Sequence, residues 1–293
     1  MNQMKLSPSK MKFLSAMGIF GTVGIFVKFI PLSSAAIAFF RGVLGVAFLL
    51  FVMLAGKQCF DKAAIKRNLL ILCLSGVAIG INWILLFESY KYTTVATATV
   101  CYYLAPLFLL LASPLLGERL TVKKLCCIGV ALLGLVFVSG MMEGGLPPLS
   151  ELAGVGFGVG AALFYATVMV LNKKLTPIPA YDKTVIQLAA ASAVILPYLL
   201  LGGIREILTL NGTGIVLLLV VGFIHTGFAY AMYFGSMKDL TAQTIAVFSY
   251  LDPVIAVLLS ALLLKEPITI WGILGSVLIL GSALYSELPQ KQK

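Results

Sequence analysis

Apolar stretches of roughly 18–24 residues recur along the whole of this 293-residue chain, each long enough to cross a hydrocarbon core of ~30 Å as a helix. Only 11% of the residues are charged and 60% are hydrophobic, whereas soluble domains average roughly 25% and 45–50%. These features exclude a soluble globule. The sequence therefore predicts an all-α, polytopic membrane protein.

We expect ten membrane spans, joined by loops too short to hold a soluble domain. They are placed at about 12–30, 34–55, 68–89, 93–116, 122–140, 152–172, 183–202, 213–234, 240–264 and 269–286. The opening MNQMKLSPSKMKF precedes an apolar run, as in a secretory signal peptide. That run continues through Lys28 and Pro31 into another span, without a small-residue cleavage site. We interpret it as the first membrane helix.

The positive charges are distributed unevenly between the two sides of the predicted spans. If the N-terminus is cytoplasmic, 16 of the 21 lysines and arginines fall in cytoplasmic segments, four fall outside and Arg41 lies within a span. By the positive-inside rule, both termini are then cytoplasmic. We expect the protein to lie in the cell membrane. The net charge of +10 thus reflects topology, and we expect no nucleic-acid partner.

The two halves of the chain contain a repeated pattern. The segment YKYTTVATATVCYYLAPLFLLLASPLLGERLT, from Tyr90, aligns with MKDLTAQTIAVFSYLDPVIAVLLSALLLKEPIT, from Met237. The aligned pairs include Trp83 with Tyr230, Tyr103 with Tyr250, Pro106 with Pro253, and Glu118 with Glu266. The repeat unit is five helices, which predicts halves at 1–143 and 144–293. Because five is odd, the second half must enter the bilayer from the opposite face, as in many alternating-access transporters.

The repeated motifs resemble those of EamA-type members of the drug/metabolite transporter superfamily, across nearly the whole chain. One copy runs from FGTVGIFVKF through AFFRG to YLAP, LLGERLT and GVALLG, and the other contains SYLDPVIA, LLLKEPIT and GSVLILG. The resemblance implies ten helices in two inverted five-helix repeats. It also implies a central cavity lined mainly by the first, third, fourth, sixth, eighth and ninth spans, and export or exchange of small metabolites.

Asp252 and Pro253 stand near the centre of the ninth span. Ionisable groups inside spans are rare and usually face an interior cavity. Asp252, which shares a helix face with Ser249, is therefore a candidate proton-titrating or substrate-binding carboxylate; the alternative is a buried acid that joins two helices. A proline in mid-helix removes a hydrogen bond and favours a kink. Pro106 and Pro253 are accordingly candidate hinges, with static kinks as the alternative.

His225 and Arg41 are two further ionisable residues within predicted spans. Histidine titrates near neutral pH, so His225 is a candidate substrate-binding or second titrating group; a hydrogen-bonded packing role is the alternative. As a lone histidine it predicts no metal site. Arg41 lies near the outer end of the second span. It either extends to the interface, pairs with Glu88 or binds an anionic substrate group.

Aromatic and neutral polar residues recur at similar depth in several spans. Rings with polar tips suit a cavity that holds an amphipathic metabolite, although interface belts and core packing are alternatives. The candidate lining residues are Trp83, Tyr230, Tyr103, Tyr250, Tyr102 and Asn82.

The chain contains no nucleotide-binding loop, no nucleophile–base constellation and no cysteine spacing typical of zinc sites. We therefore predict a gradient-driven secondary transporter, not an enzyme, without a cofactor. The favoured substrates are amino acids or related amphipathic compounds, with nucleotide sugars or cationic drugs as alternatives. An intramembrane enzyme or a channel is a weaker alternative. The expected partners are the bilayer and a small molecule, with protons as a candidate coupling ion; the oligomeric state is not predicted.

Overall fold

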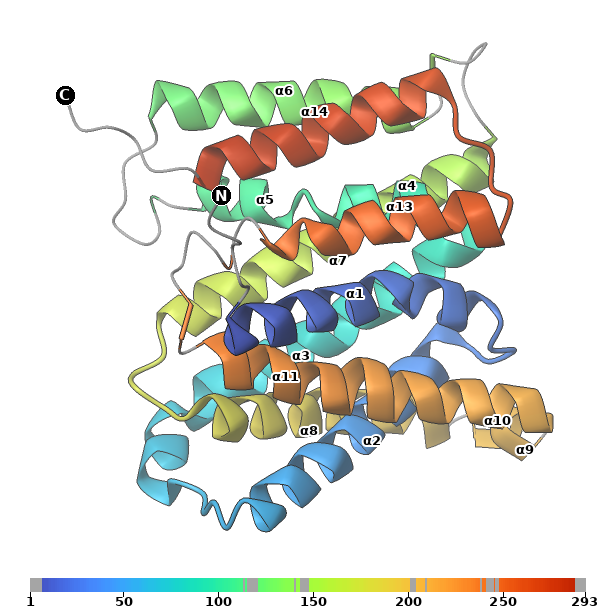
Figure 1. The fold of residues 1–293 in the computed structure, drawn as a ribbon. Helices are drawn as coiled ribbons and strands as arrows, with labels where there is room; N and C mark the ends of the chain where they lie inside the picture. Colours follow the sequence, from blue (N-terminus) through green and yellow to red (C-terminus); the bar gives the residue numbers. More distant parts are fainter. Residues whose placement is uncertain are drawn as a thin grey trace.

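The computed structural model describes residues 7–112, 114, 121–139, 141–142, 148–200, 204–208, 210–237, 239–240, 245 and 248–287. In these ranges the chain forms helices and no strands (Figure 1). Glu118 of the predicted repeat lies outside the described residues.

The helices overlap the predicted spans in order. The first half contains α1 (Pro8–Lys28), α2 (Ser34–Ala55), α3 (Lys62–Tyr92), α4 (Val95–Tyr102), α5 (Ala105–Leu111) and α6 (Val122–Val138). The second half contains α7 (Leu149–Lys173), α8 (Ala180–Tyr198), α9 (Ile204–Leu208), α10 (Gly212–Leu219), the π-helix η3 (Val220–Phe228), α11 (Ala229–Met237), α13 (Leu251–Leu263) and α14 (Ile270–Glu287).

Polar side chains at the N-termini explain where many of these helices begin. Ser7, Ser33, Asp61, Thr94 and Asn211 each accept a hydrogen bond from the backbone N–H three residues further on. Such caps satisfy donors that have no partner within the helix. The caps therefore separate consecutive apolar runs into distinct helices.

Several helices are long and apolar enough to cross a membrane. By length and composition these are Pro8–Lys28, Ser34–Ala55, Lys62–Tyr92, Leu149–Lys173 and Gly212–Ser236. Shorter apolar helices cover Val95–Leu111, Leu125–Val138, Leu251–Leu263 and Ile270–Tyr285. The protein is therefore a multi-pass membrane protein. Ten crossings in two inverted repeats remain a prediction.

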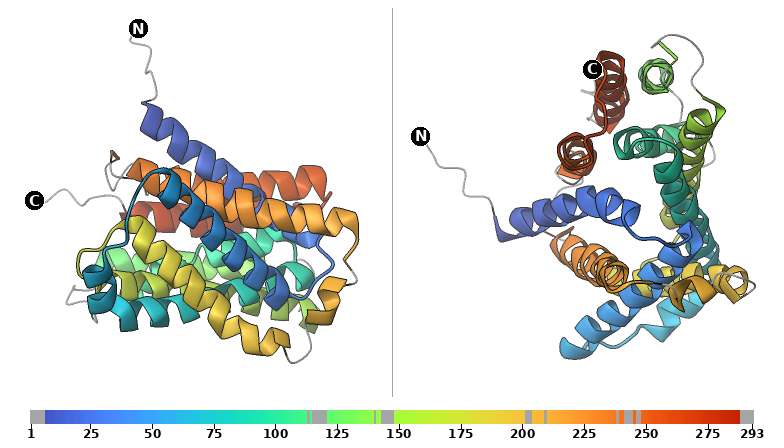
Figure 2. Two further views of the ribbon diagram at one scale, coloured as in Figure 1. Left: turned by 90° about the horizontal axis from the view of Figure 1, so that it is seen from below. Right: turned by 90° about the vertical axis from the view of Figure 1, so that its right-hand side faces the viewer.

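The two predicted halves pack against each other along most of the bundle. α3 contacts α7 and α8, α1 contacts α13 and α11, α2 contacts α8 and η3, and α6 contacts α14. The views from below and from the side show helices of early and late sequence lying next to one another (Figure 2). A site formed in the centre of the bundle must therefore draw residues from both halves.

The α6–α14 contact depends on two facing glycines. A β-carbon added at Gly134 would lie 2.8 Å from the Gly275 carbonyl oxygen, and one added at Gly275 would lie 2.6 Å from the Gly134 carbonyl oxygen. Small residues allow membrane helices to approach closely. The helices α6 and α14 lie along one edge of the bundle (Figure 1), and neither contributes a described residue to the candidate site.

The helices are interrupted just before both candidate hinge prolines. A turn at Tyr103 and Leu104 separates α4 from α5, and Pro106 lies in the first turn of α5. Pro253 likewise lies in the first turn of α13, after a turn at Tyr250. A proline is tolerated there because its missing N–H would have no helical partner. The predicted bends thus coincide with helix interruptions, whereas movement at them remains a prediction.

Candidate functional site

A cavity of about 600 Å³ lies between the helices. Its size falls within the roughly 300–1,000 Å³ typical of small-molecule sites. Residues from all six spans that the family resemblance implied contribute to its wall. α2 adds Arg41 and α8 adds Lys183, Thr184 and Gln187.

Most of the residues predicted from the sequence lie in this wall. They are Arg41, Asn82, Trp83, Tyr102, Tyr103, Pro106, Tyr230, Ser249, Tyr250 and Asp252. Pro253 is buried in α13, beside Asp252, and does not line the cavity. The structure thus brings together side chains that are up to 211 positions apart in the sequence.

His225 lies outside the cavity wall. It is buried between η3 and α1, with Nε2 2.8 Å from Thr22 Oγ1 and Nδ1 3.3 Å from the Val220 carbonyl oxygen. The Phe26 ring lies 4.8 Å from the imidazole ring. This is the geometry of the packing role that the sequence left as an alternative.

Arg41 is turned inward and is only 5% exposed. Its Nε donates to Thr226 Oγ1 at 2.7 Å, and its guanidinium carbon lies 4.4 Å from the centre of the Trp83 ring. Among the described residues the ion pairs are Lys28–Glu266 and Lys91–Glu88, so no carboxylate there pairs with Arg41.

Glu88, the partner considered for Arg41, is instead held at the end of α3. It accepts hydrogen bonds from Lys91 Nζ at 3.1 Å and from Ser34 Oγ at 2.6 Å. A buried cation without a counter-ion is costly to desolvate. Arg41 therefore offers a strong binding position for an anionic group of a ligand in the cavity.

Asp252 lies beside the backbone carbonyl group of Ser249, which precedes α13. Proline has no backbone N–H, so it cannot donate to the carbonyl oxygen four residues earlier, that of Ser249. The Tyr103 hydroxyl lies 3.1 Å from this oxygen and 2.8 Å from Asp252 Oδ2. A hydroxyl has a single proton. Tyr103 can therefore donate to the carboxylate or to the carbonyl oxygen, but not fully to both.

Aromatic rings cover much of the remaining wall. Tyr102 stacks on Tyr165 with 5.2 Å between ring centres, and Tyr103 and Tyr250 lie 5.9 Å apart. Asn82 also faces the cavity, and its side-chain amide donates to the Ala161 carbonyl oxygen at 2.6 Å, joining α3 to α7. The cavity therefore combines aromatic surface with two cationic side chains, Arg41 and Lys183, and one acidic side chain, Asp252.

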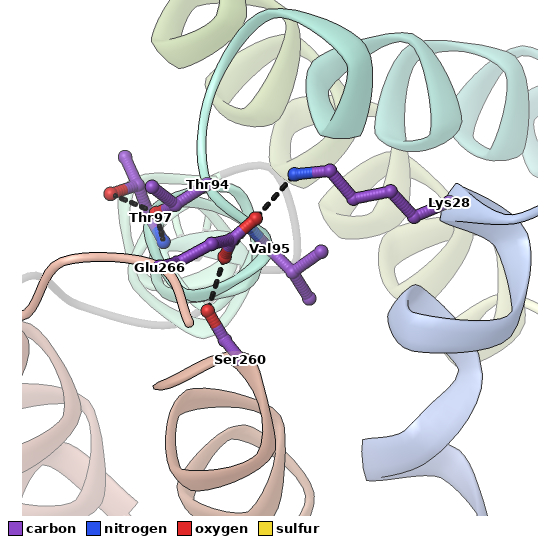
Figure 3. A network of polar contacts seen from close by, with 6 residues as sticks. All are labelled: Lys28, Thr94, Val95, Thr97, Ser260 and Glu266. Atoms are coloured by element: carbon purple, nitrogen blue, oxygen red, sulfur yellow. Dashed lines mark hydrogen bonds and ion pairs between the residues drawn. The ribbon is translucent and has the colours of Figure 1, made fainter. Parts of the chain in front are cut away.

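A cluster of polar contacts surrounds Glu266 (Figure 3). The Glu266 carboxylate pairs with Lys28 of α1 and accepts hydrogen bonds from Ser260 Oγ and, at 2.8 Å, from the backbone N–H of Val95. Val95 is the first residue of α4, where a negative charge is favoured by the exposed N–H groups. One carboxylate thus connects α1, α4 and the end of α13. We call this the Glu266 cluster.

Three features of the candidate site and its surroundings were not found by sequence reasoning. Lys183 was interpreted only as a topology signal, yet it lines the cavity, with Nζ 5.9 Å from the Phe234 ring. Thr226 and the Glu266–Lys28 pair involve residues 185 and 238 positions apart. The charge of Lys183 at the start of a span could have suggested the first. No local pattern could have indicated the other two.

A multi-pass helical bundle that surrounds a small-molecule cavity is typical of membrane carriers. The model of the EamA-like transporter family matches this chain twice, over residues 10–140 and 152–286. The chain belongs to that family. It is therefore a member of a transporter family and not of an enzyme family, as the sequence predicted.

The chain is also similar to individual transporters. The "Uncharacterized transporter YxxF" of Bacillus subtilis is 32% identical over 276 residues, which cover 93% of this chain and 87% of that protein. The "Probable amino-acid metabolite efflux pump" of Salmonella typhimurium is 29% identical over 252 residues, covering 80% and 82%. A solved crystal structure matches with a TM-score of 0.64 and 19% identity, covering 95% and 98%, which supports the fold alone.

Proposed function

We propose that this protein is a gradient-driven secondary transporter that exports or exchanges amino acids or related amphipathic compounds by alternating access. In this proposal the inverted repeats are 1–143 and 144–293, and both termini are in the cytoplasm. The observation that carries the proposal is the position of Arg41 and Asp252 in one aromatic-walled cavity, without an ion-pair partner for either among the described residues.

Each part of an amino acid would meet a matching group. Arg41 would bind the carboxylate, because guanidinium groups bind carboxylates through two parallel hydrogen bonds. The Asp252 carboxylate would accept from the ammonium group. The rings of Tyr102, Tyr165 and Tyr230 would hold the apolar part. The efflux-pump name of the Salmonella relative agrees with this substrate class.

Cationic compounds are the second candidate substrates. Asp252 lies among Tyr103, Tyr250 and Tyr230, and aromatic faces attract cations. Arg41 disfavours this alternative, because a purely cationic ligand would leave the buried guanidinium without a counter-ion.

The proposal predicts saturable counterflow of amino acids. Proteoliposomes loaded with each of the twenty standard amino acids would be diluted into a trace of the radiolabelled form. At least one should exchange, and its decarboxylated amine should compete poorly because it cannot bind Arg41. Protein-free liposomes are the control. Exchange of cationic dyes with no amino-acid exchange would contradict the proposed substrate class.

The described structure supports an inward-facing state. The Glu266 cluster joins α1, α4 and the end of α13 on the side that the charge distribution predicts to be outside. The cavity reaches Asn172, Lys183 and Phe234 near the predicted cytoplasmic ends of α7, α8 and α11. Opening to the outside would have to break the contacts of Glu266 with three helices. We therefore expect the Glu266 cluster to act as the outer gate.

Cysteine labelling tests both the gate and the orientation. In a cysteine-free background, Thr99→Cys in the cavity wall should react with a membrane-impermeant reagent only from the cytoplasmic side. Adding Glu266→Gln should raise its labelling from outside about tenfold, because losing a hydrogen-bonded charge costs roughly 1.5–3 kcal/mol. Lys91→Gln, which breaks an ion pair within α3 at the same end, should change it little.

Marker cysteines give the orientation in the same experiment. A cysteine at the exposed position Arg205 should label from outside, and one at the exposed position Lys62 should label from inside. Labelling of both markers from one side would contradict the inverted arrangement. An unchanged outer accessibility of Thr99→Cys in the Glu266→Gln variant would contradict the gate alone.

A further inference from the structure

The helix that carries Thr226 changes its geometry beside the cavity. η3 is a nine-residue π-helix between α10 and α11. π-Helical turns are rare and often occur at functional sites. Two side chains make contacts with the same spacing as the backbone of this helix. Thr226 Oγ1 donates to the Val221 carbonyl oxygen at 3.1 Å, and His225 Nδ1 lies 3.3 Å from the Val220 carbonyl oxygen. Both contacts span five residues.

The spacing of glycines in η3 matches the side chains of α2. A β-carbon added at Gly222 would lie 2.5 Å from Leu44 Cβ, and one added at Gly227 would lie 2.5 Å from Phe48 Cβ. The glycines are five residues apart, the hydrogen-bond spacing of a π-helix, whereas Leu44 and Phe48 are four apart, the hydrogen-bond spacing of an α-helix. α2 therefore packs closely against the π-helical segment itself.

Thr226 is held between these two contacts. A β-carbon added at Gly45 of α2 would lie 2.6 Å from Thr226 Cγ2, so the threonine methyl occupies the space that this glycine leaves. Thr226 is 0% exposed. Arg41 lies one turn before Gly45 in α2, so the hydroxyl of Thr226 is placed beside Arg41.

The hydroxyl of Thr226 has its proton committed to Val221, so its lone pairs accept from Arg41 Nε at 2.7 Å. This bond uses the Nε–H of the guanidinium, and the Trp83 ring covers one face. Within the described part of the chain, no partner is recorded for the two terminal amino groups of Arg41, which lines the cavity. The end of the guanidinium, with its pair of N–H donors, is the edge left for a ligand.

We propose that Thr226 is a positioning residue that turns this edge of Arg41 toward the cavity and so confers preference for substrates that have a carboxylate. The inference rests on the proposed function, because it takes Arg41 to be the carboxylate-binding group. The π-helix is the structural device: it brings the Thr226 hydroxyl to Arg41 while its glycines admit α2. Without the bond to Thr226, the guanidinium could rotate about its side chain and offer two competing edges.

Two substitutions at Thr226 distinguish a role in positioning Arg41 from a role in packing. Thr226→Val keeps the branched shape and loses the hydroxyl, and Thr226→Ser keeps the hydroxyl and loses the methyl group that fills the space at Gly45. Counterflow KM and Vmax would be measured in proteoliposomes for L-phenylalanine and for 2-phenylethylamine, its analogue without a carboxylate.

Thr226→Val should raise the KM for L-phenylalanine about tenfold, in line with the loss of one charge-assisted hydrogen bond, with Vmax and the KM for 2-phenylethylamine within about twofold of wild type. Thr226→Ser should keep the wild-type preference. A packing role predicts the reverse order, with Thr226→Ser impaired and Thr226→Val normal, and that result would overturn the inference.

Transport of the two probes by the wild-type protein shows whether a negative result contradicts this inference alone or also the proposed function. If wild type transports both probes with equal KM, or exchanges none of the twenty amino acids, the proposed function itself is contradicted and the inference with it. If wild type prefers L-phenylalanine and Thr226→Val keeps that preference, only the role of Thr226 is contradicted.

Discussion

Arg41→Ala is expected to lower the transport of carboxylate-bearing substrates by at least about 30-fold while the protein remains folded and inserted. Removing one partner of a buried, hydrogen-bonded charge pair costs roughly 2–5 kcal/mol, and each 1.4 kcal/mol is a factor of ten. Arg41 has no carboxylate partner among the described residues, so its loss leaves no buried anion there unpaired. The measurement is the initial rate of counterflow in proteoliposomes.

Arg41→Lys should restore only part of this activity. An ammonium group is a point charge without the two parallel donors of a guanidinium, and it cannot make the same bond to Thr226 while it binds a ligand. Arg67→Ala, at an exposed position of α3, is the matched control and should transport like wild type. Normal transport by Arg41→Ala would mean that the arginine serves only to pack against Trp83.

Asp252→Asn is expected to abolish accumulation driven by a pH gradient while exchange at equal pH survives. The ammonium group of the substrate and a proton would compete for the same carboxylate, so binding one releases the other. Such competition makes the carrier an exchanger of substrate for protons. In proteoliposomes with an acidic interior, wild type should therefore accumulate substrate inside, because protons leave as substrate enters.

Asparagine at position 252 cannot bind and release a proton, so coupling to the pH gradient is lost. Its side-chain oxygen can still accept a hydrogen bond from the ammonium group of the substrate, so exchange survives. Asp252→Glu should keep some coupling with an altered pH optimum. Asp239→Asn, at an exposed acid bonded to Ser9, is the matched control and should accumulate substrate like wild type. Wild-type pH dependence in Asp252→Asn would assign Asp252 the structural role, holding Tyr103 and the interrupted helix in place.

The location of Asp252 was predictable because a carboxylate in a membrane span has few acceptable environments. It must face water, a cavity or a polar partner, so a hydropathy pattern with one acid in it already restricts the rotation of that helix. For Arg41 the same argument left extension to the interface open as well. It could not choose between Glu88 and a ligand as the partner of Arg41, because either would supply the negative charge and the sequence does not show which one is near.

For His225 this argument could not predict whether the side chain faces the cavity. Neutral imidazole is small and amphipathic enough to be buried, so depth in a span does not decide whether it faces a cavity. Contacts with Thr22 and Val220 place it between two helices instead. Its predicted role as a second titrating group in the cavity has no support from this position.

The sequence by itself determined that the chain crosses a membrane as helices, because the length and apolar character of each run leave few alternatives in hydrocarbon. It also indicated the repeated pattern, the helix interruptions at Pro106 and Pro253 and the family. Only the tertiary structure decided that Thr226 holds Arg41, that Glu266 joins three helices and that His225 lies outside the cavity. The rotation of a helix about its own axis depends on close packing against helices distant in sequence, as at Gly45 and Thr226, and hydropathy contains no information on that contact.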